Sequence, residues 1–138
     1  MKRTQWRPWL PVIAASESLV SSAGGVLLGQ TARVCGLDRA LAAALRPWRL
    51  PLAVHAPAKM VADLAIAVGL GGDCAADIAL LRAQPGVFGL VASDPTVSRL
   101  IARLAADTDR ALAAIRGARA KARAWVWAKA GTPRIKVW

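Results

Sequence analysis

Residues 93–104 read SDPTVSRLIARL, and this stretch decides the fold class. Asp94 suits the cap of a helix and Pro95 suits its first helical position, where the missing N–H costs nothing. Four apolar residues follow at the spacing i, i+3, i+4 and i+7, namely Val97, Leu100, Ile101 and Leu104. This spacing puts them on one helix face about 100° wide, so the stretch predicts an amphipathic helix that packs on a core.

The next segment predicts a longer helix that runs to about Ala130. Asp107-Thr108-Asp109 is typical of a helix start, and Gly131-Thr132-Pro133 ends the pattern. One stripe of this helix is expected to face the core, and it consists of Ala111, Ile115, Ala118, Ala122 and Trp125. A neighbouring stripe is basic and consists of Arg116, Arg119 and Arg123.

The part of the chain before residue 93 also has helical patterns. Residues 26–34 and 37–45 flank a turn at Gly36, which is the spacing of a helix-turn-helix motif. A recognition helix at 38–45 would offer mainly Arg39 to the bases, so we favour a helical hairpin within the core. A further helix is expected after Pro57, apolar nearly all round and therefore buried, and another at 74–83 with Asp73 as its cap. Pro85-Gly86 and Gly89 break the chain again.

These patterns predict an all-α fold, a compact bundle of about six helices. Three regions are expected: a basic flexible arm at 1–25, a helical domain at 26–130, and a short irregular tail at 131–138. The chain has 138 residues, of which 56% are hydrophobic, and this is enough for one modest domain. Alanine is abundant, but GC-rich codons also favour alanine, so alanine content is discounted as a helix signal.

Positive charge is distributed unevenly and indicates an anionic partner. The formal net charge is +11, from 19 Lys and Arg against 8 Asp and Glu. Residues 1–98 hold nine basic and six acidic side chains, whereas residues 99–138 hold ten basic and two acidic ones. Nucleic acid is the commonest partner of such a surface, although a solvated basic face is the alternative. The candidate DNA-contacting residues are Thr96, Ser98, Arg99, Arg103, Arg116, Arg119 and Arg123 on the helices, with Lys2, Arg3 and Arg7 in the arm.

Few residues offer catalytic or metal-binding chemistry. Asp73 and Asp77 are spaced i, i+4 as a metal pair would be, but helix capping is the stronger interpretation, and Asp63 is expected to pair with Lys59. Two distant cysteines and a single histidine exclude a disulfide framework and a Cys/His zinc site, and they favour a reduced, cytoplasmic setting. The longest uncharged stretch, 18–32, is too short to cross a membrane.

Five runs are distinctive in combination: HAPAK at 55–59, VADLA at 61–65, GGDCAADI at 71–78, LLRAQPGVFG at 80–89 and VASDPTVSRL at 91–100. Together they resemble the N-terminal region of DDE-type insertion-sequence transposases, in the group-one branch of actinobacterial type. The resemblance covers roughly residues 2–130 and is most specific at 71–99. It implies a helical region that precedes an RNase H-like domain. The resemblance implies that in that domain two Asp and one Glu hold a divalent metal ion such as Mg²⁺, and that the enzyme cuts and joins transposon ends.

The last eight residues, GTPRIKVW, depart from the family, which continues into a strand that bears the first catalytic aspartate. We therefore expect a truncated transposase fragment that binds DNA, with no catalytic position, no enzymatic activity on its own and no cofactor of its own. The alternative is a structural or oligomerisation module that docks through Trp125 and Trp127, with self-association when this face is free. A membrane-surface helix at 109–130 fits less well because that face is mainly alanine.

Overall fold

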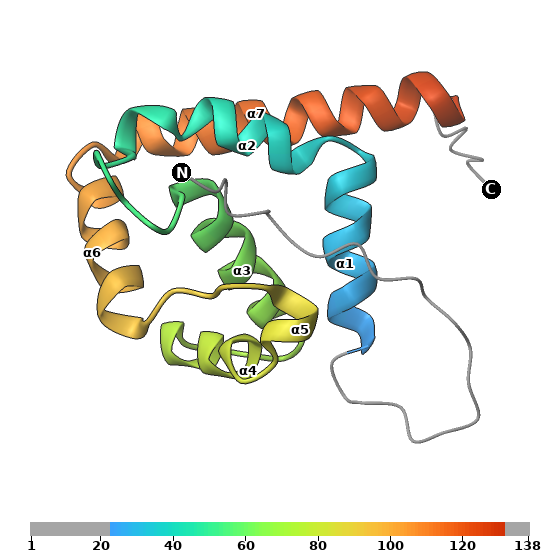
Figure 1. Cartoon of the computed structure of the whole chain (residues 1–138). Coiled ribbons are helices and arrows are strands. Elements are labelled where there is room, and N and C mark those ends of the chain that lie inside the picture. The colour runs from blue at the N-terminus through green and yellow to red at the C-terminus, as the bar shows by residue number, and fades with distance from the viewer. Residues whose placement is uncertain (1–22, 132–138) are drawn as a thin grey trace, which may run out of the picture.

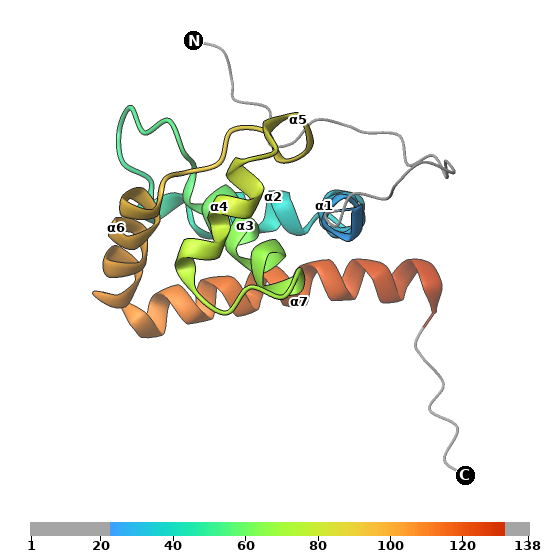
Figure 2. The same ribbon diagram turned by 90° about the horizontal axis from the view of Figure 1, so that it is seen from below.

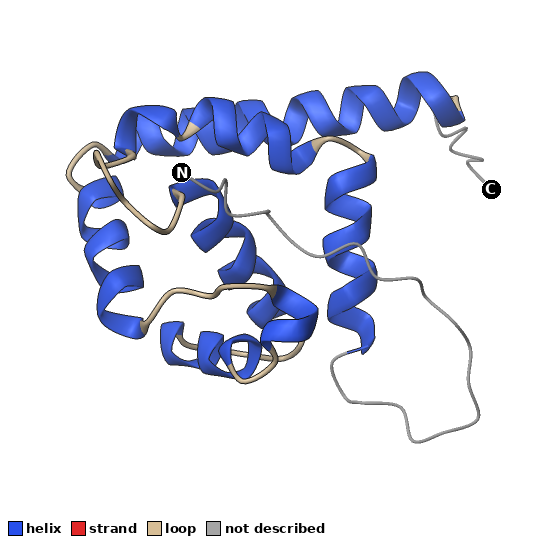
Figure 3. Cartoon of the chain, viewed as in Figure 1, coloured by secondary structure: helices blue, strands red, loops and turns tan. Residues whose placement is uncertain are grey.

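The computed structural model describes residues 23–131, and this part of the chain is entirely helical (Figures 1 and 3). Seven α-helices follow one another: α1 (Ala23–Val34), α2 (Leu37–Ala44), α3 (Pro57–Gly69), α4 (Ile78–Arg82), α5 (Pro85–Phe88), α6 (Asp94–Ala105) and α7 (Thr108–Ala130). Two short 3₁₀ helices, η1 (Arg46–Trp48) and η2 (Ala75–Asp77), lie between them. The all-α prediction is confirmed. The structure has one α-helix more than the six expected in this part of the chain. The additional helix is α5, a single turn at a place where the sequence indicated only a break. It forms there because Pro85 at its first position suits a helix start.

Helices α1 and α2 meet at the predicted turn at Gly36, but they run at a steep angle to one another rather than antiparallel, which corrects the predicted hairpin (Figures 1 and 2). This glycine has φ 73°, a left-handed conformation that costs other residues more than glycine. Helix α1 begins at Ala23, so the predicted arm at 1–25 overlaps the first turn of the helix. Gly25 is buried there, and a Cβ at this position would lie 2.9 Å from Cζ of Phe88. Helix α1 therefore packs closely on the segment that carries α5.

Helix α3 lies at the centre of the bundle, as its nearly all-round apolar pattern predicts (Figure 1). Its buried residues join one core cluster with residues of α4, α5 and α6, among them Phe88 and Leu100. A second core cluster lies on the other side of α3, where Leu41, Leu45, Ala58 and Ala118 meet. Two cores that share α3 hold the whole described part together.

Helices α6 and α7 carry most of the predicted DNA-contacting residues. In α6, Val97 and Leu100 are fully buried and Leu104 is half-buried. Ile101 has the same predicted role, but it is 44% exposed. The buried face of α6 is therefore narrower than the apolar spacing predicted. Along α7, the predicted core stripe is buried at Ala111, Ala118 and Ala122 and half-buried at Ile115. Trp125, the last member of that stripe, is 44% exposed, which corrects its predicted core position.

The exposure of Trp125 follows from where α7 runs. Helix α7 packs along α2 over its first part and then continues past α1, beyond the rest of the bundle (Figures 1 and 2). It ends at Ala130 before Gly131, as predicted. Within residues 23–131, no helix combines the length and the hydropathy that a membrane span requires.

Candidate nucleic-acid interface

The start of α6 brings two predicted contact residues, Thr96 and Arg99, together, whereas Ser98 faces about 160° away from Thr96 at 100° per residue. Ser98 and Arg99 are exposed, and Thr96 is half-buried. Nη2 of Arg99 donates a hydrogen bond to Oγ1 of Thr96 at 3.2 Å, and the hydroxyl groups of Thr96 and Ser93 lie 3.0 Å apart. A guanidinium group and hydroxyl groups at the positive end of a helix favour a phosphate oxygen.

The cap of α6 is Ser93, which corrects the prediction of Asp94. Proline is tolerated at either of the first two helical positions, so Pro95 did not fix the start to a single residue. Asp94 lies within the first turn, where its carboxylate accepts a hydrogen bond from Nη1 of Arg82 at 3.0 Å. Arg82 also donates to the carbonyl oxygen of Ala92 at 3.1 Å. Arg82 thus joins α4 to the start of α6, a contact that helical periodicity could not reveal.

Arg103 differs from Arg99, although both are predicted DNA-contacting residues on α6. Arg103 is half-buried, and its Nε is buried with no hydrogen-bond partner among residues 23–131. Arg110, at the start of α7, is engaged by its neighbours: it lies over the Trp48 ring at 5.3 Å and 3.5 Å from Oδ2 of Asp107. Arg110 is nevertheless exposed, so the guanidinium groups of both Arg99 and Arg110 are accessible at this end of the molecule.

Helix α7 presents a compact basic group. Arg116, Arg119 and Arg123 are exposed and line one shallow hollow, with Gly117 and Ala120 between them. At 3.6 residues per turn, the three arginines fall within an arc of roughly 60° of the helix surface. A fourth side chain joins this face, because the Arg123 guanidinium lies 5.4 Å from the centroid of the Trp127 ring. The structure confirms that these arginines lie together.

Asp73, Cys74 and Asp77 form the group of side chains closest to a metal site in residues 23–131, with ligand atoms within 4.8 Å of one another. Oδ2 of Asp77 accepts hydrogen bonds from the backbone N–H groups of Asp73 at 2.8 Å and Cys74 at 3.0 Å. It also lies 3.3 Å from Sγ of Cys74. These hydrogen bonds, the Cys74 N–H bond above all, lower the pKa of the Asp77 carboxyl group.

The N-cap of η2 is Cys74, which corrects the predicted cap Asp73. Asp77 completes a capping box, because its carboxylate accepts the hydrogen bond from the N–H of Cys74. The group suits Mg²⁺ poorly, because that ion prefers six oxygen ligands and this cluster offers a thiol and a carboxylate already held by N–H groups. The hydrogen bonds account for the cluster without an ion.

The predicted pair of Lys59 and Asp63 is confirmed. Nζ of Lys59 lies 2.7 Å from Oδ2 of Asp63, and both side chains are buried. The same ammonium group donates to the carbonyl oxygen of Phe88 at 3.1 Å, and so ties α3 to α5. Nearby His55 is half-buried, and burial lowers its pKa, with a further lowering by the charge of Lys59 that Asp63 opposes.

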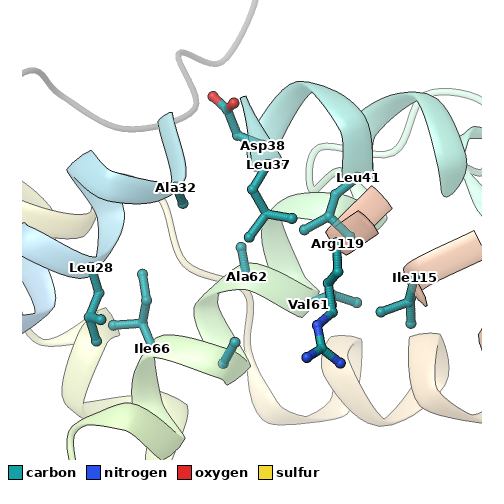
Figure 4. A pocket seen from close by; sticks show the side chains of 11 residues that line it. Leu28, Ala32, Leu37, Asp38, Leu41, Val61, Ala62, Ile66, Ile115 and Arg119 are labelled. Atoms are coloured by element: carbon teal, nitrogen blue, oxygen red, sulfur yellow. The ribbon is translucent and has the colours of Figure 1, made fainter. Parts of the chain in front are cut away.

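An apolar pocket of about 240 Å³ lies beside the arginine face of α7 (Figure 4). Side chains of α1, α2, α3 and α7 line it, including Leu28, Leu41, Ile66 and Ile115. Arg119 contributes to this pocket as well as to the hollow on α7. The three other predicted contact residues, Lys2, Arg3 and Arg7, lie outside the described residues.

Comparison with known proteins gives one match. Residues 10–131 match the family described as Transposase DDE domain group 1. No curated protein and no solved structure matches the chain. The matched segment covers most of the chain, including all the helices from α1 to α7. This chain therefore belongs to the group 1 family of DDE-domain transposases.

Proposed function

We propose that this chain is a DNA-binding fragment of a transposase that holds duplex DNA through the arginine face of α7. The observation that carries the proposal is the compact group of three exposed guanidinium groups at Arg116, Arg119 and Arg123. Guanidinium groups bind phosphate oxygens with two hydrogen bonds each, and releasing counterions from the phosphates provides much of the free energy of binding. Membership of the transposase family supports DNA as the anion.

The other predicted contact residues extend this surface in the proposal. The first two turns of α6 supply Thr96, Ser98 and Arg99, and Arg103 contributes less because it is half-buried. Lys2, Arg3 and Arg7 add positive charge from the N-terminal arm. Trp127 lies against Arg123 and widens the face with an aromatic ring. Such a role belongs in the cytoplasm, where bacterial DNA is found.

A salt titration tests the proposal directly. Neutralising about six phosphates makes the logarithm of affinity fall with the logarithm of salt concentration at a slope of about −5. The triple variant Arg116→Gln, Arg119→Gln, Arg123→Gln is expected to reduce the magnitude of this slope by about 3, close to one unit per phosphate contact. Fluorescence anisotropy with a labelled duplex measures both slopes.

Two exposed lysines of the same helix provide the control. Lys121 and Lys129 point away from the arginine arc at 100° per residue. The double variant Lys121→Gln, Lys129→Gln is expected to change the slope less than Arg116→Gln, Arg119→Gln does. If both double variants reduced the magnitude of the salt slope equally, the result would show that bulk charge rather than the arginine face binds DNA.

We propose no cleavage activity for this chain, since the acidic group at residues 73–77 suits Mg²⁺ poorly. Incubation of supercoiled plasmid with the purified protein and Mg²⁺ tests this. Magnesium-dependent nicking that survives rigorous purification would contradict the proposal, and Asp77→Ala would then show whether that group is responsible.

The second candidate function is self-association or docking through the end of α7. Trp125, Val126 and Trp127 are 44%, 39% and 45% exposed, and they lie where α7 has passed the bundle. Sedimentation equilibrium of the wild type and of Trp125→Ala separates the candidates. A monomer that binds DNA supports the first function, whereas an oligomer that binds no DNA and dissociates on Trp125→Ala supports the second.

A further inference from the structure

A second basic site lies on a different part of the molecule. A cavity of about 600 Å³ opens where the end of α2 and η1 meet the start of α3. Arg39, Arg46 and Arg49 line it on one side. His55 and the first turn of α3 line it on another, and Leu90 comes from the loop after α5. None of its lining residues belongs to α6 or α7, the helices that carry the proposed duplex-contacting arginines.

The charge of this cavity is positive and unbalanced. No aspartate or glutamate lines it. Arg46 and Arg49 are exposed, and neither takes part in a salt bridge within residues 23–131. Guanidinium groups that share a concave wall repel one another, and a bound anion removes that repulsion. The arginines at 46 and 49 therefore favour an anionic ligand.

Two neighbouring groups refine the site. Lys59 lines the cavity, but its ammonium group is held by Asp63 and by the carbonyl of Phe88, so it forms a fixed wall. The guanidinium of Arg39 lies near Gly36, with Nη2 3.5 Å from the position that a Cβ would take. Arg39 thus reaches away along α2, and the site depends on Arg46 and Arg49, on either side of Trp48.

The remaining wall is apolar and accessible. Val54 and Leu90 line the cavity and are 63% and 49% exposed. Aliphatic side chains beside guanidinium groups provide a surface for a planar ring next to a site for an anion. The volume lies in the range of small-molecule pockets, about 300–1,000 Å³. From this juxtaposition we infer that the cavity binds a nucleotide through its phosphate group, with Arg46 and Arg49 on the phosphate and Val54 and Leu90 against the base.

The imidazole group of His55 provides an intrinsic NMR probe for this site. His55 is the only histidine, and it lines the cavity, so its imidazole NMR signals report on this place alone. Titration of the full chain with a nucleoside 5′-monophosphate is expected to shift these signals in a saturable manner. The bound dianion is also expected to raise the pKa of His55, because negative charge stabilises the imidazolium form. The corresponding nucleoside, which has no phosphate group, is expected to leave the His55 signals and the pKa of His55 unchanged.

Matched variants make the inference falsifiable. The double variant Arg46→Gln, Arg49→Gln is expected to weaken the apparent affinity for the nucleotide, obtained from the His55 shifts, at least tenfold. The control variant Lys121→Gln, Lys129→Gln removes the same amount of charge elsewhere and is expected to keep the wild-type affinity. Circular dichroism confirms that each variant is folded. No saturable shift of the His55 signals with nucleotide or inorganic phosphate, or equal responses from the arginine variant and the wild type, would overturn the inference.

Oligonucleotides distinguish the source of the phosphate. A 5′-phosphorylated single strand that competes with the mononucleotide, where the 5′-hydroxyl strand does not, would support a site for strand ends. Competition by neither strand would support a site for free nucleotides. Loss of duplex binding in the α7 arginine variants, with the His55 response intact, would show that the two sites are independent.

Discussion

Replacement of Lys59 by methionine is expected to destabilise the protein severely. The Lys59 side chain is 5% exposed and that of Asp63 is 1% exposed, and their charged atoms lie 2.7 Å apart. The substitution leaves the Asp63 carboxylate buried without its ion-pair partner, and it removes the donor to the carbonyl of Phe88. Removing one member of a buried pair costs about 3–5 kcal/mol. For a chain of this size, that loss corresponds to a fall in melting temperature of roughly 10–20 °C.

A double variant isolates the cause. Lys59→Met, Asp63→Leu removes both charges, so no charge is left buried without its counter-ion, and loss of the donor to the Phe88 carbonyl costs about 1–3 kcal/mol. The double variant is therefore expected to be more stable than the single variant, even though it carries one more change. Urea denaturation followed by circular dichroism gives the free energy of unfolding for each. A loss below about 1 kcal/mol for Lys59→Met, or a double variant less stable than the single one, would refute the reasoning.

Four further predictions concern local structure. Gly117→Ala is expected to stabilise the protein by about 1 kcal/mol, because nothing lies within 4 Å of the new methyl group. Gly25→Ala is expected to destabilise it by about 1–3 kcal/mol, because the methyl group would meet the buried ring of Phe88 at 2.9 Å; thermal melts compare the two. Asp77→Ala is expected to lower stability at neutral pH. Folding lowers the pKa of Asp77, so its contribution to the free energy of unfolding is full above the ordinary pKa of 3.8. This contribution is lost as the pH falls through the folded-state pKa. The denaturation curves of the variant and the wild type are therefore expected to converge in acid. Leu52 has φ 59° and is 86% exposed, so Leu52→Gly is expected to raise the urea midpoint where Leu52→Ala does not.

Local sequence patterns predicted the helices well, because a helix is formed by contacts between residues that are close together along the chain. The i, i+4 spacing of Lys59 and Asp63 was enough to predict their contact, and the turn at Gly36 followed from its position between two apolar runs. Arg116 and Arg119 share a helix face for the same reason. Features fixed within one or two turns of a helix were accessible to sequence reasoning.

Tertiary placement was not accessible in this way. Ile101 has the spacing of a core residue, but it is exposed because no neighbouring helix covers that edge of α6. The contact of Arg82 with Asp94 spans twelve residues and joins two helices. The cavity at Arg46 and Arg49 exists only because the chain returns there with the start of α3. Each of these depends on the packing of helices, which periodicity leaves open.

Alanine content was discounted as a helix signal, yet the alanines of α7 have a structural role. Ala111, Ala118 and Ala122 are buried, and α7 makes its most extensive contact with α2. Small side chains at these positions allow the two helices to approach closely, and Ile115 is the larger residue of the stripe that packs on the same core. The arginines at 116, 119 and 123 lie on a neighbouring face and are exposed, and Arg119 also lines the apolar pocket.

The same helix therefore separates the two candidate functions by geometry. At 100° per residue, Trp125 continues the buried alanine stripe beyond the end of the bundle, whereas Trp127 falls on the arginine arc and lies against Arg123. A partner that extended the packing along α2 would cover Trp125, and a duplex bound by the arginines would cover Trp127. In these proposals Trp125 would serve docking alone, whereas Trp127 would serve both surfaces, so a bound duplex and a docked partner would compete for Trp127 but not for Trp125.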